Sequence, residues 1–382
     1  MSVPRIRVDG FNKNFEKKIF GEIVRSISTR MYIKSVVSDL GEYEVIQQGD
    51  TPILGYSNDQ PFEKYKSVIL FGDHTLSLYR PKAPFLLATD GIKILQSTIL
   101  KRDYLYYLTQ NYIPKSQGYK RHYSVLKQVF VNYSRDSSEQ SAIGSFFRTL
   151  DNLLTSYKDN LTNYQSLKAT MLSKMFPKAG QTVPEIRLDG FEGEWEKSKL
   201  KDVAHRVQGN DGRMDLPTLT ISASGGWMNQ IDRFSANIAG KEQKNYTLLK
   251  KGELSYNHGN SKLAKYGVVF ELQDYEEALV PKVYHSFRVN QLADAKFIEI
   301  MFSTKIPDRE LGKLVSSGAR MDGLLNISFD DFMNITIIIP TLEEQQAVGA
   351  YFSNLDNLIN SYQEKITQLE TLKKKLLQDM FI

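Results

Sequence analysis

The chain has 382 residues, a net charge of +5 and an ordinary share of apolar residues, so we expect two or more globular domains with buried cores. It contains no cysteine, which excludes disulfide bonds, zinc sites with thiolate ligands and cysteine nucleophiles. No apolar run approaches the length of a membrane span, and the first residues do not resemble a signal peptide. We therefore expect a cytoplasmic protein without a membrane role, whose basic balance permits nucleic-acid binding without requiring it.

Two short segments of similar sequence open the two halves of the chain. Residues 3–17 read VPRIRVDGFNKNFEK and residues 183–197 read VPEIRLDGFEGEWEK, at an offset of 180 residues. A second repeat closes each half: residues 139–176 and 344–381 align without a gap at an offset of 205, with 17 of 38 positions identical. The chain is therefore interpreted as a tandem duplication, with a variable region between each opener and its closing repeat.

The variable regions, from about Glu22 to Asp136 and from about Asp202 to Pro340, have the pattern of mixed α+β domains. Short apolar runs punctuated by Gly and Asp turns predict strands, and two longer periodic stretches predict helices. The predicted strands are Ser67–Phe71, Phe85–Leu87, Gly91–Leu95, Lys265–Leu272, Lys282–Val289 and Ile335–Ile339, and the predicted helices are Leu100–Gln110 and Ala293–Ser303.

Each closing repeat is predicted to be one long helix with an apolar seam. The apolar residues alternate at four and three positions over more than four heptads, which favours a coiled coil; one helix per half, buried against its own domain, is the alternative. The seam includes Phe147, Leu150, Leu154, Tyr157 and Leu161 in the first helix, and Phe352, Leu355, Ile359, Tyr362 and Ile366 in the second.

The seam and the start of each helix carry matched polar residues. Lys168 and Lys373 interrupt the two seams at the same place, which fits helices that meet each other or a common partner; an ammonium that turns outward to solvent is the simpler interpretation. Asp136 before Glu139 and Thr341 before Glu344 predict capping boxes or close relatives at the two helix starts.

These patterns divide the chain into four segments. Residues 1–136 and 177–341 are predicted to be two globular α/β domains, and residues 137–176 and 342–382 two long antiparallel coiled-coil helices. The predicted fold class is α+β with an internal pseudo-twofold repeat.

The sequence lacks the motifs of a self-contained enzyme. There is no Gly-rich loop ending in Lys-Ser or Lys-Thr, no Asp/Asn-Pro-Pro-aromatic motif of an amino-methyltransferase and no helical His pair for a metal. Asp308 with Glu310 and Lys313 has the wrong spacing for a nuclease site. We therefore predict no catalytic residues, no metal and no cofactor.

Basic and amide side chains near predicted turns are the candidates for binding. Arg and Lys can contact phosphates or guanine, and Asn can pair with adenine. The alternative for each is an ordinary solvated loop. The candidate DNA-binding residues are Arg80, Lys120, Arg121, Asn260, Lys262 and Arg320.

Taken over nearly the whole chain, the arrangement resembles the specificity subunits of type I restriction–modification systems. The resemblance rests on the openers VPRIRVDGF and VPEIRLDGF, on the joint ITIIIPTLEEQQAVGAYFSNLD at 335–356, and on two matched helices alternating with two unlike domains. Residues 67–74 and 246–256 are also similar to that family's target-recognition domains. The first joint, VNYSRDSSEQ, lacks a proline at the place of Pro340, so its entry into the helix is expected to differ.

The resemblance implies a non-catalytic subunit that gives a methyltransferase and endonuclease complex its DNA sequence specificity. Each target-recognition domain would read one half of a bipartite site in double-stranded DNA, and the helices would set the spacer between the halves. Two methylation subunits would dock along the helices, and restriction subunits would join through the complex. Two other hypotheses stay open: a coiled-coil scaffold with two protein-binding domains and no DNA role, and a self-contained enzyme.

Overall fold

The computed structural model describes residues 4–34, 36–118, 120–234, 240–259, 261–315 and 324–381, which fall into two compact units. Unit 1 comprises residues 1–160 together with 362–382, and unit 2 comprises residues 161–361. Each long helix therefore contributes its first part to one unit and its last part to the other. Within the described ranges, no helix has the length and apolar character needed to span a membrane.

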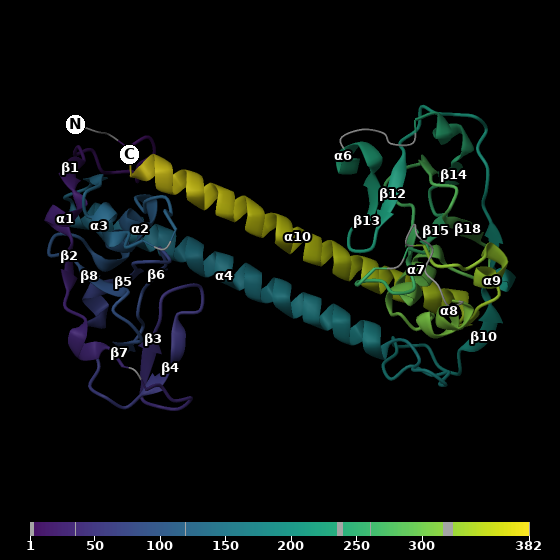
Figure 1. The fold of residues 1–382 in the computed structure, drawn as a ribbon, viewed down its shortest axis with the longest axis horizontal. Helices are drawn as coiled ribbons and strands as arrows, with labels where there is room; N and C mark the ends of the chain where they lie inside the picture. The colour runs from purple at the N-terminus through teal and green to yellow at the C-terminus, as the bar shows by residue number, and fades with distance from the viewer. Residues whose placement is uncertain are drawn as a thin grey trace. The chain divides into compact units, whose positions relative to one another are not determined.

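Unit 1 is an α+β domain that includes parts of both long helices (Figure 1). Short 3-10 helices at Arg30–Tyr32 and Tyr65–Ser67 lie in its loops. In chain order its elements are β1 (Glu16–Ile19), α1 (Phe20–Ile23), β2 (Arg25–Ile27), β3 (Tyr43–Ile46), β4 (Ile53–Ser57), β5 (Val68–Gly72), β6 (Leu78–Tyr79), β7 (Phe85–Leu87), β8 (Ile92–Gln96), α2 (Arg102–Asn111), α3 (Tyr123–Leu126), β9 (Phe130–Tyr133) and the start of α4 (Ser137–Lys174).

Unit 2 repeats this plan with more strands. A 3-10 helix lies at Gly240–Asn245. The elements are β10 (Glu196–Lys199), α5 (Leu200–Val203), β11 (Ala204–Arg206), β12 (Leu219–Ser222), β13 (Gly226–Asn229), α6 (Gln230–Phe234), β14 (Thr247–Lys250), β15 (Leu254–Asn257), β16 (Val268–Glu271), β17 (Glu277–Val280), β18 (His285–Val289), α7 (Ala295–Ser303), α8 (Asp308–Leu314), α9 (Phe329–Met333), β19 (Thr336–Ile339) and the start of α10 (Leu342–Met380).

The central sheets of the two units correspond. Unit 1 has a four-stranded sheet in the order β2-β8-β5-β6, and unit 2 has one in the order β11-β18-β15-β16, both antiparallel. Unit 1 adds the sheet β4-β3-β7, whose β3 and β7 are parallel, whereas unit 2 adds the pairs β12-β13 and β14-β17. The units thus share a frame and differ in what is attached to it.

The α+β class and the predicted elements are confirmed. The six predicted strands appear, within a few residues, as β5, β7, β8, β16, β18 and β19, and the two predicted helices as α2 and α7. Sequence reasoning missed the ladder that closes each variable region: β1 pairs antiparallel with β9, and β10 with β19. The two ends of each variable region therefore lie side by side.

An arginine from each opener anchors the start of a long helix. Arg7 Nε and Nη2 donate to the two carboxylate oxygens of Glu139 at 2.6 and 2.9 Å, and Arg187 does the same to Glu344 at 2.7 and 2.6 Å. Both glutamates are fully buried. Because a buried carboxylate is stable only when it is paired and hydrogen-bonded, these ion pairs fix the opener to the helix.

The glutamine after each glutamate fastens the variable region to the same helix turn. Gln140 accepts from the backbone N–H of Lys101 and donates to the carbonyls of Ile99 and Ser134. Gln345 accepts from the N–H of Asp294 and donates to the carbonyls of Leu292 and Pro340. The repeated Glu-Gln pair is therefore the joint between each domain and its helix.

The predicted capping boxes are half correct. Asp136 and Thr341 do accept hydrogen bonds from the backbone N–H of Glu139 and Glu344. The glutamate side chains do not turn back onto the caps, however, because the opener arginines take their carboxylates. The expected difference in the first joint is confirmed: Ser134 lies six residues before Gln140 and its hydroxyl donates to Glu139, whereas Pro340 lies five residues before Gln345.

Each long helix ends in the core of the unit it enters last. Phe176, after α4, lies 5.5 Å from Phe297 and 5.7 Å from Trp195 in unit 2, measured between ring centres. Phe381, after α10, lies 5.2 Å from Tyr104 in unit 1. Each helix therefore packs its start on its own half and its end on the other half, which the model of one helix per domain does not describe.

Within each unit the two helices run antiparallel and are joined by a lysine–aspartate pair. In unit 1 Lys373 contacts Asp151 at 2.5 Å, and the rings of Tyr157 and Tyr362 lie 5.4 Å apart. In unit 2 Lys168 pairs with Asp356. The interpretation that these lysines turn outward to solvent is wrong, because each ammonium crosses to the aspartate that the duplication places at the same position of the other helix.

Candidate nucleic-acid interface

Two of the predicted DNA-binding residues lie on an exposed loop of unit 1 that a buried histidine holds in place. Lys120 and Arg121 are exposed, and Arg121 forms a solvent-facing pair with Asp90 at 3.3 Å. His122, next in the chain, is fully buried and contacts the carbonyl of Asp73 through Nδ1 at 3.0 Å. Its Nε2 accepts from the N–H of Gln117, so the neutral ring with a proton on Nδ1 satisfies both bonds.

Asp73 completes this anchor. Its carboxylate accepts from the backbone N–H of Tyr123 at 2.7 Å, and the side chain is almost fully buried. The loop therefore has a rigid base and an exposed basic tip, an arrangement suited to contacts with phosphates or base edges. Sequence patterns do not indicate this anchor, because Asp73 and its partner His122 lie 49 residues apart in the chain.

In unit 2 the described candidate is Lys262, which is exposed after β15. Asn260 and Arg320 lie outside the described residues. The segment at 325–327 is fastened by two stacked histidines. His258 contacts the carbonyl of Leu325 at 2.8 Å, His285 contacts that of Ile327 at 2.9 Å, and the two ring centres lie 4.7 Å apart.

Burial lowers the pKa of His285 to about 4, although its hydrogen bond to the Ile327 carbonyl opposes this shift. The unfolded chain, with an ordinary histidine pKa near 6.5, then binds a proton that the folded unit does not. Stability should therefore fall as the pH decreases below about 6.5 and continue to fall until about 4, by at most about 3 kcal/mol. Urea unfolding followed by tryptophan fluorescence checks this, since both tryptophans, Trp195 and Trp227, lie in unit 2.

The control is His285→Gln, which keeps a donor for the Ile327 carbonyl but cannot titrate. It should be less sensitive to pH over the same range than the unsubstituted chain. An identical pH dependence in both proteins would contradict the assignment of this effect to His285.

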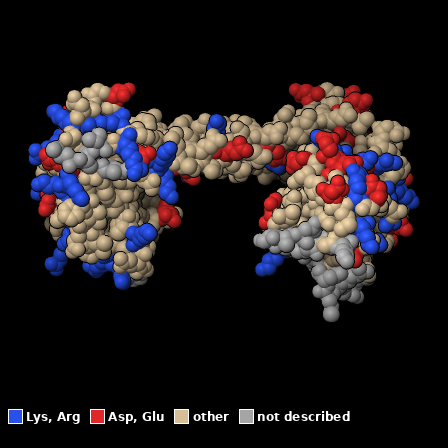
Figure 2. Space-filling view, turned by 90° about the horizontal axis from the view of Figure 1, so that it is seen from above, with Lys and Arg blue, Asp and Glu red and all other residues tan. Residues whose placement is uncertain are grey.

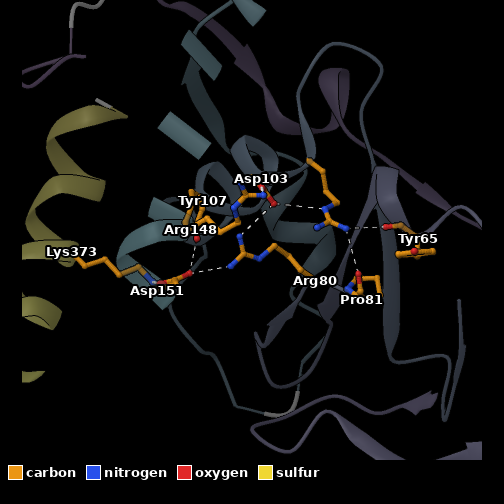
Figure 3. Close-up of polar contacts among 9 residues, drawn as sticks. Tyr65, Arg80, Pro81, Asp103, Tyr107, Arg148, Asp151 and Lys373 are labelled. Atoms are coloured by element: carbon orange, nitrogen blue, oxygen red, sulfur yellow. Dashed lines mark hydrogen bonds and ion pairs between the residues drawn. The ribbon is translucent and has the colours of Figure 1, made fainter. Parts of the chain in front are cut away.

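Arg80, the first predicted DNA-binding residue, is held in an ion-pair network instead of an open loop (Figure 3). Its guanidinium contacts Asp151 on α4 at 3.1 Å and Asp103 on α2 at 3.4 Å, and it lies 4.3 Å from the ring centre of Tyr106. Asp151 also accepts from the Tyr107 hydroxyl at 2.6 Å. Burial and the bond to Asp151 raise the pKa of Tyr107, so its hydroxyl keeps its proton.

The predicted seam residues are buried or half-buried along both helices. Phe147, Leu150, Leu154, Phe352, Leu355, Ile359 and Ile366 are buried, and Tyr157, Leu161 and Tyr362 are half-buried. Their spacing explains this, because residues four and three apart fall on one face of a helix.

A second apolar set on the helices stays exposed, and the duplication repeats it. On α4 the set is Phe146, Leu153 and Leu167, with 44, 43 and 37% exposure. On α10 the matching residues are Tyr351, half-buried, and Leu358 and Leu372, with 36 and 47% exposure. Intervals of seven and fourteen residues place each set along one stripe of its helix. We call these six residues the exposed stripe.

Charge is distributed unequally between the units. Unit 1 has 26 Lys and Arg against 19 Asp and Glu, a net charge of +7, whereas unit 2 has 23 against 25, a net charge of −2. Among the charged residues on the face drawn in Figure 2, Lys and Arg outnumber Asp and Glu on unit 1, while both signs are mixed on unit 2. The described residues contain no group of three or more acidic or histidine side chains that could hold a metal ion.

Comparison with known proteins gives a consistent result. Residues 192–371 match the model of the type I restriction modification DNA specificity domain. The chain is 22% identical over 313 residues to the type I restriction enzyme MjaVIII specificity subunit of Methanocaldococcus jannaschii, which covers 76% of this chain and 72% of that protein.

A solved structure has the same fold. The crystal structure of the type I restriction-modification system S subunit from M. genitalium aligns over 100% of this chain and 99% of its own, with a TM-score of 0.63 and 14% identity. The family domain lies in the second half of the chain, and the relative extends across both halves. Together with the shared fold, these matches agree with the duplicated architecture. By these matches the chain is similar to the specificity subunits of type I restriction–modification systems.

Proposed function

We propose that this chain selects the DNA sequence for a type I complex by reading a bipartite site, one half with each unit. The reading domains are residues 1–136 and 177–341. The observation that carries the proposal is the repeated joint: the same Arg-Glu-Gln contacts attach two unlike domains to two matched helices. Two matched helices that each carry a different domain suit a DNA target made of two different half-sites.

The exposed tip at Lys120 and Arg121 is our candidate for base or phosphate contacts in the first half-site, and Lys262 is the candidate in the second. Asn260 and Arg320 remain candidates on sequence grounds. Arg80 is a weaker candidate because two carboxylates and a tyrosine ring already engage its guanidinium.

The test replaces one variable region, the segment that lies between two paired strands, with a different variable region. The chain, assembled with its methylation subunits, should methylate adenines in a new half-site while the other half-site stays the same. Mapping of methylated adenines in random-sequence DNA gives the result directly. Unchanged methylation after exchange of either region would refute the proposal and favour a scaffold without a DNA role.

We further propose that the exposed stripe is where two methylation subunits dock, one on each copy. Exposed apolar side chains that recur at the same positions fit a partner present twice. Leu153→Glu should weaken the association of one methylation subunit and Leu358→Glu that of the other, each by about 2 kcal/mol or more. Analytical ultracentrifugation of the mixed subunits measures the stoichiometry.

The matched controls are Asn152→Glu and Asn357→Glu, which add the same charge one residue away on exposed positions. Both control variants should still assemble with two methylation subunits. Full assembly by both leucine variants would exclude the exposed stripe as the docking surface.

A further inference from the structure

A groove in unit 1 is lined by five cationic side chains and one carboxylate. The cations are Lys66, Lys82, Lys101, Arg102 and Arg148, and the carboxylate is Asp103. They come from the 3-10 helix before β5, from the loop after β6, from the start of α2 and from the first turns of α4. We call this feature the basic groove.

The single carboxylate is already shared among three arginines. Asp103 contacts Arg148 at 3.0 Å, Arg80 at 3.4 Å and Arg102 at 3.7 Å (Figure 3). Arg80 also pairs with Asp151 at 3.1 Å, so two carboxylates face three guanidinium groups and the network around Asp103 keeps an excess of positive charge.

The three lysines add to that excess. Lys66, Lys82 and Lys101 are exposed, and none has an acidic partner among the described residues. Arg102, in contrast, is held in position: its Nη1 lies 3.4 Å from the carbonyl of Pro81 and 3.5 Å from that of Tyr65. The basic groove thus combines a fixed guanidinium with exposed ammonium groups.

The corresponding corner of unit 2 has a different set of charges, with Ala295 in place of Arg102 and Lys296 in place of Asp103. Gln140 binds the N–H of Lys101, whereas Gln345 binds the N–H of Asp294, so an aspartate takes the place of Lys101. On the helix, Ser353 stands where the duplication has Arg148. Over these four positions unit 1 has a net charge of +2 and unit 2 a net charge of zero.

We propose that the basic groove binds the phosphate backbone of double-stranded DNA without regard to sequence, as an anchor that only unit 1 possesses. The inference rests on the proposed DNA-reading function and adds a second contact region to it. Guanidinium and ammonium groups form charge-assisted hydrogen bonds to phosphate oxygens, and several cations in one groove match a chain of phosphates. Such contacts position the duplex and contribute to affinity through counterion release.

The experiment compares two triple variants of the full chain in complex with its methylation subunits. One is Lys66→Ala, Lys82→Ala, Lys101→Ala in the basic groove. The other, a control of equal charge, is Lys201→Ala, Lys244→Ala, Lys282→Ala, three exposed lysines of unit 2. DNA affinity is measured at several salt concentrations on duplexes with the recognised site and with scrambled sequence.

The groove variant should reduce the slope of log affinity against log salt by about 2 to 3, because each phosphate that the protein no longer neutralises lowers the slope by roughly 0.9. The decrease should be equal on both duplexes, the methylated sequence should not change, and the control should retain the full slope. If the triple variant fails to fold, Lys101→Asp alone, which installs the side chain found in unit 2, should give a smaller decrease of the same kind.

Equal slopes for the groove variant and the unsubstituted complex would overturn the inference. So would unchanged DNA affinity with weaker association of the methylation subunits, which would make the basic groove a protein-docking surface. Absence of DNA binding by the unsubstituted complex would instead refute the proposed function itself.

Discussion

Asp151→Ala is expected to lower the free energy of unfolding of unit 1 by about 3 kcal/mol. Asp151 accepts from Arg80 at 3.1 Å, Lys373 at 2.5 Å and the Tyr107 hydroxyl at 2.6 Å, and these side chains are largely buried. Its removal takes away the carboxylate that Lys373 and the Tyr107 hydroxyl share, and leaves Arg80 with Asp103 alone. Calorimetry should show the decrease, while tryptophan fluorescence, which reports on unit 2, should change much less.

Asp356→Ala is the matched control, since the duplication places Asp356 at the same helix position. Its described ion pair is with Lys168, and the two side chains are 37 and 32% exposed. An exposed pair of this kind contributes less than about 1 kcal/mol. Equal decreases in the two variants would contradict the role assigned to Asp151.

Exchanging the two charged side chains within each lysine–aspartate pair should show a further difference between the two units. Lys168→Asp combined with Asp356→Lys should restore the stability that either change alone removes. Lys373→Asp combined with Asp151→Lys should not, because the introduced ammonium would face Arg80. Restoration in both units would show that Arg80 contributes little.

Arg187→Ala is expected to cost about 3 to 5 kcal/mol, because it leaves the buried carboxylate of Glu344 without a cation. Arg7→Ala should cost less, since Glu139 keeps the hydroxyl of Ser134 as a donor. Urea unfolding followed by tryptophan fluorescence measures the Arg187 variant, because Trp195 lies in the adjoining core.

Addition of Glu344→Gln to the Arg187 variant should recover most of the stability, because the amide carries no charge that needs a partner. Failure of this double variant to recover would indicate that the arginine acts through packing, and not through the ion pair.

Local patterns predicted the elements well and the contacts of individual side chains poorly. The seam of α4 and α10 could be predicted because burial follows helical spacing directly. Residues 85–87 could be predicted as a strand because all three are buried in β7. In each case the determining interactions repeat within a short stretch.

Arg80 shows why the site was harder to predict. The residues around it, Tyr79, Pro81 and Lys82, have the pattern of a basic turn. That pattern does not indicate that the Arg80 guanidinium points inward. Its partners Asp103 and Asp151 lie 23 and 71 residues away. The opener arginines were missed for the same reason, although the repeat of Arg7 as Arg187 beside a repeated Glu-Gln pair could have indicated them.

The ladders β1–β9 and β10–β19 have a consequence for how such genes can change. Each ladder pairs the two ends of a variable region through four residue pairs. The first pair is Glu16 with Tyr133 in one ladder and Glu196 with Ile339 in the other. A genetic crossover within both strands of one ladder would replace everything between them and leave the anchoring arginine, the first helical turn and the reading frame untouched. New target sequences could then arise by recombination of whole cassettes, while the complex assembles throughout.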